Sequence, residues 1–198
     1  MADFLGRLEH LFHPIDGWGD FRRGARKAAV VFVLYRADGR WMVPFVRRRA
    51  DLRDHAGQVA LPGGGVQEGE SAWSAAQREV AEEIGVPVGR LVPLGTGDPI
   101  YAAVSNFSVV PFVAYLPDPV PAFVHDEQEL DGVLEIPLDR LLDDSAWLQS
   151  DDPWRFRYLA HEESVVWGLT ERIFAGLAPK LIAALSEDQK PDPPAVRG

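Results

Sequence analysis

The pattern of apolar and polar residues predicts a chain in which strands and helices alternate. Residues 28–35 form a β-branched apolar run, Asp38-Gly39 has the composition of a two-residue hairpin turn, and residues 41–46 return as the partner strand. Other apolar runs predict strands over 59–61, 91–94, 108–115, 133–136, 154–159 and 164–167. The order of these elements predicts a mixed α/β fold class.

Helical periodicity is clearest in two segments. Ser71 can cap the start of a helix over 72–84, and Gly85 follows as the residue at which that helix ends. Apolar residues recur in it every three or four positions, so we expect its charged residues to share an exposed face. A closing helix is expected over 170–185, and Pro179 inside it predicts a bend or a break.

Three regions are expected along the 198 residues. Residues 1–24 begin with a short amphipathic helix and form an N-terminal appendage, residues 25–185 form one folded domain, and residues 186–198 form a polar, disordered tail. A short helical turn is expected over 138–142. A chain of this length can bury one core of ordinary size.

Composition narrows the range of functions. The 46% hydrophobic content is typical of a soluble globular protein, and no apolar run approaches the ~20 residues of a membrane-spanning helix. Without cysteine there are no disulfides or thiolate sites, so a metal must be bound by oxygen or imidazole. The net charge of −10 is the wrong sign for coating nucleic acids. We expect a cytoplasmic protein with no membrane or nucleic-acid partner.

Two basic clusters stand out against this negative charge. They are Arg22, Arg23, Arg26 and Lys27, and then Arg47, Arg48, Arg49 and Arg53. Because charges are screened over ~8 Å at physiological salt, a local cluster can bind an anion even on an acidic protein. The clusters favour a small phosphorylated ligand.

The helix over 72–84 carries three carboxylates that indicate metal chemistry. Glu79 lies three residues before Glu82 and four before Glu83, so the side chains converge within one helical turn. Their repulsion destabilises the helix unless a cation lies among them. Oxygen ligands suit Mg²⁺ or Mn²⁺, and Mg²⁺ keeps part of its coordination shell for water and substrate phosphate. The pattern therefore predicts metal-dependent phosphate chemistry.

The neighbouring residues extend this pattern to nine fixed positions. They are Gly64, Glu70, Arg78, Glu79, Val80, Glu82, Glu83, Gly85 and Val86. Their spacing resembles the signature of the Nudix hydrolases at every fixed position. The resemblance implies an α/β/α sandwich with a mixed sheet. It also implies a divalent-metal-dependent enzyme that hydrolyses the pyrophosphate bond of a small nucleotide-like molecule.

The same resemblance implies roles for individual residues. The implied metal ligands are Glu79, Glu82, Glu83 and the backbone carbonyl of Gly64, and the implied catalytic residues are the same three glutamates with Arg78. Arg78 would orient the acidic cluster, and Glu70 would brace the loop against the helix that Gly85 ends. The general base stays open between Glu79 on the helix and Glu127 or Glu129 in a later acidic loop.

A second resemblance concerns the substrate. Residues before the signature are similar to the motif that precedes it in coenzyme A pyrophosphatases, namely Arg48, Arg53, Gly57 and Leu61-Pro62-Gly63-Gly64. The likeness implies cleavage of coenzyme A or a derivative to 3′,5′-ADP and (acyl-)4′-phosphopantetheine. The implied substrate-binding residues are Arg48, Arg53, Gly57 and Gln58. Arginine side chains suit this substrate because it carries both a pyrophosphate and a 3′-phosphate.

The sequence leaves other functions open. A related enzyme would cleave ADP-ribose, a dinucleotide or a nucleoside triphosphate, and a non-catalytic module of the same fold would bind a nucleotide or a protein. The intact run of carboxylates argues against the binding module, which has no need of mutually repelling charges. The oligomeric state also stays open, with a homodimer as one option.

Overall fold

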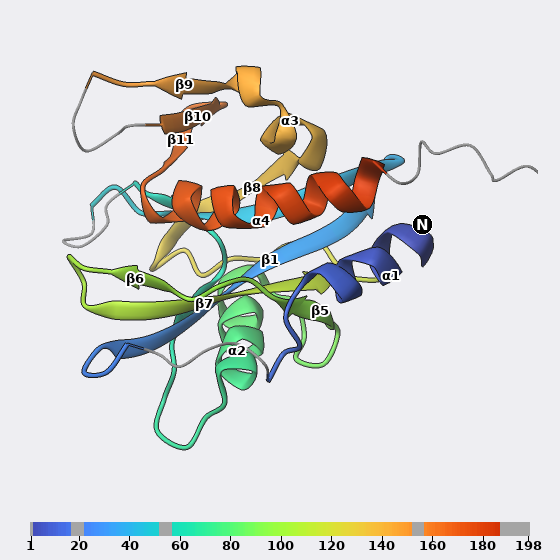
Figure 1. Ribbon diagram of the computed structural model, residues 1–198. Coiled ribbons are helices and arrows are strands. Elements are labelled where there is room, and N and C mark those ends of the chain that lie inside the picture. The colour runs from blue at the N-terminus through green and yellow to red at the C-terminus, as the bar shows by residue number, and fades with distance from the viewer. Residues whose placement is uncertain (1, 17–21, 52–56, 152–156, 187–198) are drawn as a thin grey trace, which may run out of the picture.

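The computed structural model describes residues 2–16, 22–51, 57–151 and 157–186 (Figure 1). Its helices are α1 (Ala2–Leu11), α2 (Ala72–Ile84), α3 (Leu138–Leu142) and α4 (Leu169–Ser186), with a 3₁₀ turn at Asp144–Ala146. Its strands are β1 (Arg26–Ala37), β2 (Arg40–Arg48), β3 (Val59–Ala60), β4 (Gly63–Gly65), β5 (Val92–Thr96), β6 (Ile100–Ala102), β7 (Phe107–Tyr115), β8 (Leu130–Pro137), β9 (Trp147–Gln149), β10 (Arg157–His161) and β11 (Ser164–Trp167). No helix within these ranges is long and apolar enough to cross a membrane.

Most strands belong to one mixed sheet. Its path runs β3-β2-β1-β7-β5, while β4 also pairs with β1, β6 with β7 and β8 with β2. β1 and β7 are parallel, and the other pairs of this sheet that the structure describes are antiparallel. The predicted hairpin between β1 and β2 is confirmed, since Asp38 and Gly39 have the positive φ angles of 48° and 77° that its turn requires.

Helices cover both faces of this sheet (Figure 1). On one face, α2 packs Val80 and Ile84 into an apolar cluster with strand residues such as Phe112. On the other face, α4 and α1 contribute Phe174 and Phe4, among others, to a second cluster. Three layers result, and the predicted α/β/α sandwich with a mixed sheet is confirmed.

A second, smaller sheet has the strand order β11-β10-β9 and lies beside α3 and α4 (Figure 1). Its Trp147 side chain is buried, and the ring stacks on Phe174 of α4 with 5.4 Å between centroids. At the start of α4, the buried hydroxyl of Thr170 donates a hydrogen bond to the carbonyl of Val59 at 3.0 Å. The α4 layer therefore holds β3, which leads directly into β4.

The structure departs from the sequence predictions in several places. The short strands β4, β6 and β9 were not predicted, and the predicted break at Pro179 does not occur, because α4 continues through it. One missing N–H removes a single helical hydrogen bond, whereas buried residues on both sides of Pro179, such as Leu177 and Leu181, hold the helix in the core. The helix also includes Ser186, the first residue of the expected tail. Residues 152–156 and the tail after Ser186 lie outside the described residues.

Candidate functional site

The strand β4 brings backbone into contact with both the sheet and the carboxylates of α2. A Cβ atom on Gly63, whose φ is 151°, would lie 2.3 Å from the carbonyl oxygen of Ala29, so no other residue fits there. A Cβ atom on Gly64 would lie 2.5 Å from the carboxylate carbon of Glu79. The glycines therefore allow a close backbone approach, and the Glu79 carboxylate lies directly against β4.

Local capping sets the position of α2. The Ser71 hydroxyl accepts a hydrogen bond from the N–H of Ser74 at 3.0 Å, and Gly85 takes a left-handed conformation with a φ of 72° at the other end. Beyond the helix, the N–H of Val124 donates to the carbonyl of Ile84 at 3.2 Å. Both ends of the helix lie where the sequence predicts, and its C-terminus also anchors the segment before the acidic loop.

Arg78 is the centre of the charged network on α2. Its Nη1 donates to Glu79 at 2.7 Å and to Glu82 at 3.0 Å, and its Nε donates to Glu70 at 3.0 Å. Its Nη2 donates to the carbonyl of Gly65 at 3.1 Å. One guanidinium thus joins the helix, the end of β4 and the loop before the helix.

The expected exposed face of charges on α2 is wrong in part. Glu82 is 59% exposed, but the side chains of Arg78 and Glu79 are only 24% and 18% exposed, and Glu83 is partly buried. The reason is that β4 and the loop over 65–70 cover this side of the helix, as the contact between Gly64 and Glu79 shows. Helical periodicity alone does not reveal that cover.

Glu83 is partly buried against β4. Its Oε2 accepts a hydrogen bond from the N–H of Gly63 at 2.8 Å. Burial raises the pKa of the Glu83 carboxyl to about 7, although the Gly63 N–H acts in the opposite direction. The nearby charges of Glu79 and Glu129 raise this pKa as well, and Arg48 lowers it. Glu83 therefore lies within electrostatic range of three segments: α2, the acidic loop (residues 125–129) and the arginine loop (residues 48–58).

No group of three or more histidine, cysteine, aspartate or glutamate side chains in the described ranges is arranged to hold a metal ion. Two of the three predicted carboxylates, those of Glu79 and Glu82, turn toward Arg78, and the third accepts from Gly63. In this arrangement a guanidinium is the cation among the carboxylates. The donor set still fits Mg²⁺ or Mn²⁺ in kind, because it consists of carboxylate oxygens gathered on a glycine strand that leaves space for them.

The arginine loop meets the site at the end of β2. The N–H of Arg48 donates to the carbonyl of Gln58 at 3.0 Å, and the N–H of Gly57 donates to the carbonyl of Arg49 at 3.3 Å. The Nε of Arg48 is buried without a hydrogen-bond partner in the described structure. Arg48, Gly57 and Gln58 are thus brought together, while Arg53 lies outside the described residues.

The acidic loop approaches from the start of β8. The N–H of Arg49 donates to the carbonyl of Glu129 at 3.1 Å, and the Arg49 guanidinium donates to the carbonyl of Glu127 at 2.7 Å. Of these two glutamates, Glu129 is the one whose charge acts on Glu83. The hydrogen bond from the Gly63 N–H to Glu83 was not predicted from the sequence. The run Pro62-Gly63-Gly64-Gly65 was the feature that could have indicated it, because glycine allows close approach of the backbone.

Comparisons with known proteins place this site in a family. The NUDIX domain family matches residues 25–161. The chain is 33% identical over 184 residues to the uncharacterized Nudix hydrolase NudL of Escherichia coli (strain K12), an alignment that covers 90% of this chain and 93% of NudL. It is 34% identical over 188 residues to NudL of Yersinia enterocolitica, covering 91% of this chain and 93% of that protein.

Solved structures agree on the fold. The Nudix hydrolase RenU from M. smegmatis superposes with a TM-score of 0.56 at 17% identity, covering 92% of this chain and 98% of RenU. The NUDIX domain of Shewanella oneidensis NrtR, complexed with ADP ribose, gives 0.52 at 18% identity and covers 85% and 91% of the two chains. With the family match and the NudL relatives, the conclusion is that this chain belongs to the Nudix family of hydrolases, enzymes that act on pyrophosphate bonds.

Proposed function

We propose that the chain hydrolyses the pyrophosphate bond of coenzyme A or its acyl derivatives, with Mg²⁺ or Mn²⁺, to 3′,5′-ADP and (acyl-)4′-phosphopantetheine. The observation that carries this proposal is the contact of two α2 carboxylates with β4, with Arg48 within electrostatic range of Glu83. Gly64 leaves room for the Glu79 carboxylate, and the Gly63 N–H holds that of Glu83. Acidic and basic groups therefore meet at one strand, as a site for a metal and a phosphate requires.

The metal would be held by Glu79 and Glu83, with Glu82 and the Gly64 carbonyl assisting. When bound, a divalent cation neutralises phosphate charge and lowers the pKa of coordinated water. Arg78 would hold the carboxylates in position relative to the loop before α2, because it donates to Glu79 and Glu82 and also to Glu70 in that loop. The candidates for the general base are Glu79 and, in the acidic loop, Glu127 or Glu129. The effect of the Glu129 charge on the pKa of Glu83 supports Glu129 over Glu127.

Arg48 would bind the pyrophosphate. Its buried Nε is a donor without a partner among the residues that the structure describes, and leaving such a donor unsatisfied costs free energy that a phosphate oxygen would recover. The hydrogen bonds of Arg48 to Gln58 and of Gly57 to Arg49 fix the two described ends of the arginine loop. We assign Arg53 to the same task on the motif alone.

Turnover of four substrates tests the choice of coenzyme A. Coenzyme A, ADP-ribose, a diadenosine polyphosphate and a nucleoside triphosphate are compared with Mg²⁺ and with Mn²⁺, and the products are identified by mass. We expect kcat/KM for coenzyme A to exceed the others by at least ~10-fold, as one additional charge-assisted contact allows. Equal rates on ADP-ribose and coenzyme A would defeat the substrate assignment. Binding of these compounds without turnover would instead favour the non-catalytic module.

Metal binding has a readout independent of turnover. Calorimetry or Mn²⁺ electron paramagnetic resonance on the metal-free protein should detect binding that Glu83→Gln weakens by at least ~10-fold, as expected when one protein ligand loses its charge. The matched control is Glu9→Gln, since Glu9 is exposed on α1, away from α2. Equal Mn²⁺ affinity in both variants would contradict the proposed ligand set.

A further inference from the structure

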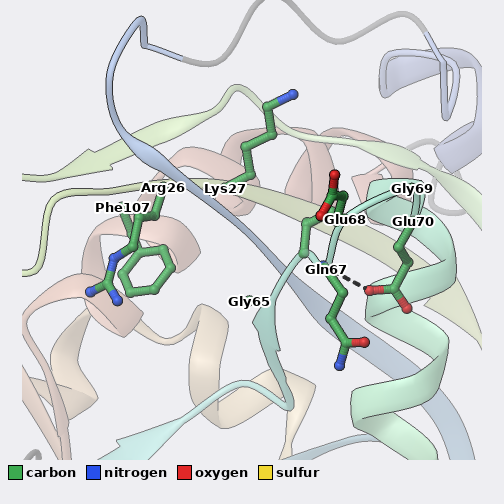
Figure 2. Close-up of a pocket in the computed structure, with 9 residues that line it drawn as sticks. Arg26, Lys27, Gly65, Gln67, Glu68, Gly69, Glu70 and Phe107 are labelled. Carbon is green, nitrogen blue, oxygen red and sulfur yellow. Dashed lines mark hydrogen bonds between the residues drawn. The ribbon is translucent and has the colours of Figure 1, made fainter.

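A cavity of about 590 Å³ lies at the start of β1, beside the loop that precedes α2. Arg26, Lys27 and Phe107 line it from the sheet, and residues 65–70 line it from the loop (Figure 2). We call it the basic cavity. Its two cations belong to the first arginine and lysine cluster of the sequence, which the candidate site above does not use.

Two cations and two acids line the basic cavity. Of the acids, Glu70 accepts hydrogen bonds from Arg78 at 3.0 and 3.2 Å. Glu68 is the remaining acid, set against the two cations Arg26 and Lys27. The cavity thus offers two cationic side chains to an anionic ligand, on a chain whose net charge is −10.

The two cations are placed differently. The guanidinium of Arg26 lies over the ring of Phe107, 4.0 Å from its centroid, and donates to the carbonyl of Ser105 at 3.0 Å. These contacts fix its plane, and because Arg26 is exposed the other face of the guanidinium is accessible. The Lys27 side chain points away from Arg26, toward another edge of the cavity (Figure 2). A flat group and an anionic group can thus be bound at separate places.

The strand β4 connects this cavity to the catalytic carboxylates. Its first residue binds Glu83, its second contacts Glu79, and its third, Gly65, lines the basic cavity. A strand rises ~3.3 Å per residue, so about 7 Å of backbone separates Gly63 from Gly65. In coenzyme A, six covalent bonds separate the 5′-phosphorus from the 3′-phosphorus, a reach of roughly 6–8 Å at ~1.5 Å per bond. A substrate whose pyrophosphate lies at the carboxylates can therefore extend its other phosphate as far as Gly65, at the border of the basic cavity.

We propose that the basic cavity binds the 3′-phosphoadenosine half of the substrate, with Lys27 contacting the 3′-phosphate and Arg26, on Phe107, stacking on the purine. This inference rests on the proposed function and adds to it the recognition of the phosphate that is not cleaved. A purine stacks on a guanidinium plane as it does on an aromatic ring. An ammonium group recognises a phosphate monoester as a point charge.

Comparison of coenzyme A with dephospho-coenzyme A, which lacks the 3′-phosphate, tests this inference. The wild-type protein should prefer coenzyme A by at least ~10-fold in kcat/KM, the size of one charge-assisted contact. Lys27→Gln should reduce this preference to within about 3-fold, mainly by raising KM for coenzyme A. Arg23→Gln is the control with the same change of charge, because Arg23 is exposed and does not line the cavity, and it should keep the preference.

Arg26→Gln separates the two parts of the site. It should raise KM for coenzyme A and dephospho-coenzyme A by the same factor, because both carry the purine. A wild-type protein that cleaves both substrates equally well, or a Lys27→Gln variant that keeps the preference, overturns the inference while leaving hydrolysis of coenzyme A in place.

Calorimetric binding of two nucleotides tests the cavity without turnover. 3′,5′-ADP should bind at least ~10-fold more tightly than AMP, and Lys27→Gln should remove that difference. Equal affinities of the wild-type protein for the two nucleotides overturn the inference. If coenzyme A is not cleaved but this difference is observed, the proposed function fails and the nucleotide site stands.

Discussion

The two helical layers of the sandwich bury different kinds of side chain. On the α4 side, Phe174 stacks with Trp147 and Phe32, and the cluster around them is apolar. On the α2 side, the partly buried side chain is that of Glu83, a carboxylate whose pKa is raised to about 7. Apolar burial stabilises the fold, whereas a buried carboxylate costs stability and supplies chemistry. Substitutions in the two layers should therefore separate stability from turnover.

The largest effect is expected in the α4 layer. Phe174→Ala should lower the free energy of unfolding by ~3–5 kcal/mol, because the ring is 3% exposed and its removal leaves a cavity. Ile182→Ala on the same helix is the control, since Ile182 is 47% exposed, and it should cost less than ~1 kcal/mol. Denaturant unfolding measures both values. Similar losses in the two variants would show that α4 is not held by its buried face.

The next effect is expected in the α2 layer and in turnover. Glu83→Gln and Glu79→Gln should each lower kcat by at least ~100-fold and leave the circular dichroism spectrum unchanged, as expected when a metal ligand is replaced. Glu9→Gln should not change kcat, because Glu9 lies on α1. Near-normal turnover in both α2 variants would reject their assignment as ligands.

Adjacent glycines of β4 offer a sharper version of the same comparison. Gly63→Ala should destabilise the fold by ~2 kcal/mol or more, because its φ of 151° is strained for alanine and its Cβ would meet the β1 backbone. Gly64→Ala should lower kcat by about 10-fold with a smaller change in stability, because its Cβ would displace only the Glu79 carboxylate. Thermal unfolding and steady-state kinetics distinguish them, and equal stabilities would contradict the assigned contacts.

The smallest effect concerns the start of α2. Ser71→Ala should lower the free energy of unfolding by ~1 kcal/mol, because the N–H of Ser74 loses its acceptor. Ser186→Ala at the end of α4 is the matched control; its hydroxyl donates within its own helix at an exposed site. If Ser186→Ala lowers the free energy of unfolding as much as Ser71→Ala does, capping does not account for the placement of α2.

Local signals account for the parts of the fold that the sequence predicts well. The limits of α2 follow from Ser71 and Gly85, and the β1–β2 turn follows from Asp38-Gly39. β4 was missed because three glycines have low strand propensity, and only pairing with β1 makes them a strand. Pro179 does not break α4, because packing of the whole α4 face outweighs one missing hydrogen bond.

The candidate site was predictable in composition but not in arrangement. The family signature identified the carboxylates of α2. The hydrogen bond from the Gly63 N–H to Glu83, however, joins residues that only the fold brings together. The basic cavity depends on the parallel pairing of β1 with β7, which sets Arg26 opposite Phe107. Such long-range neighbours have no signal in a local pattern. The cluster containing Arg26 and Lys27 was visible in the sequence, but its cavity was not.

The hydrogen bond from Val124 to Ile84 limits how far the acidic loop can travel. Val124 is fixed to the last residue of α2 at 3.2 Å, and Glu129 follows five residues later. Five residues span at most ~17 Å when fully extended, so the loop behaves as a short tether attached to α2 itself. Lengthening it between Val124 and Glu129 would free this carboxylate from the helix without altering any residue of the signature.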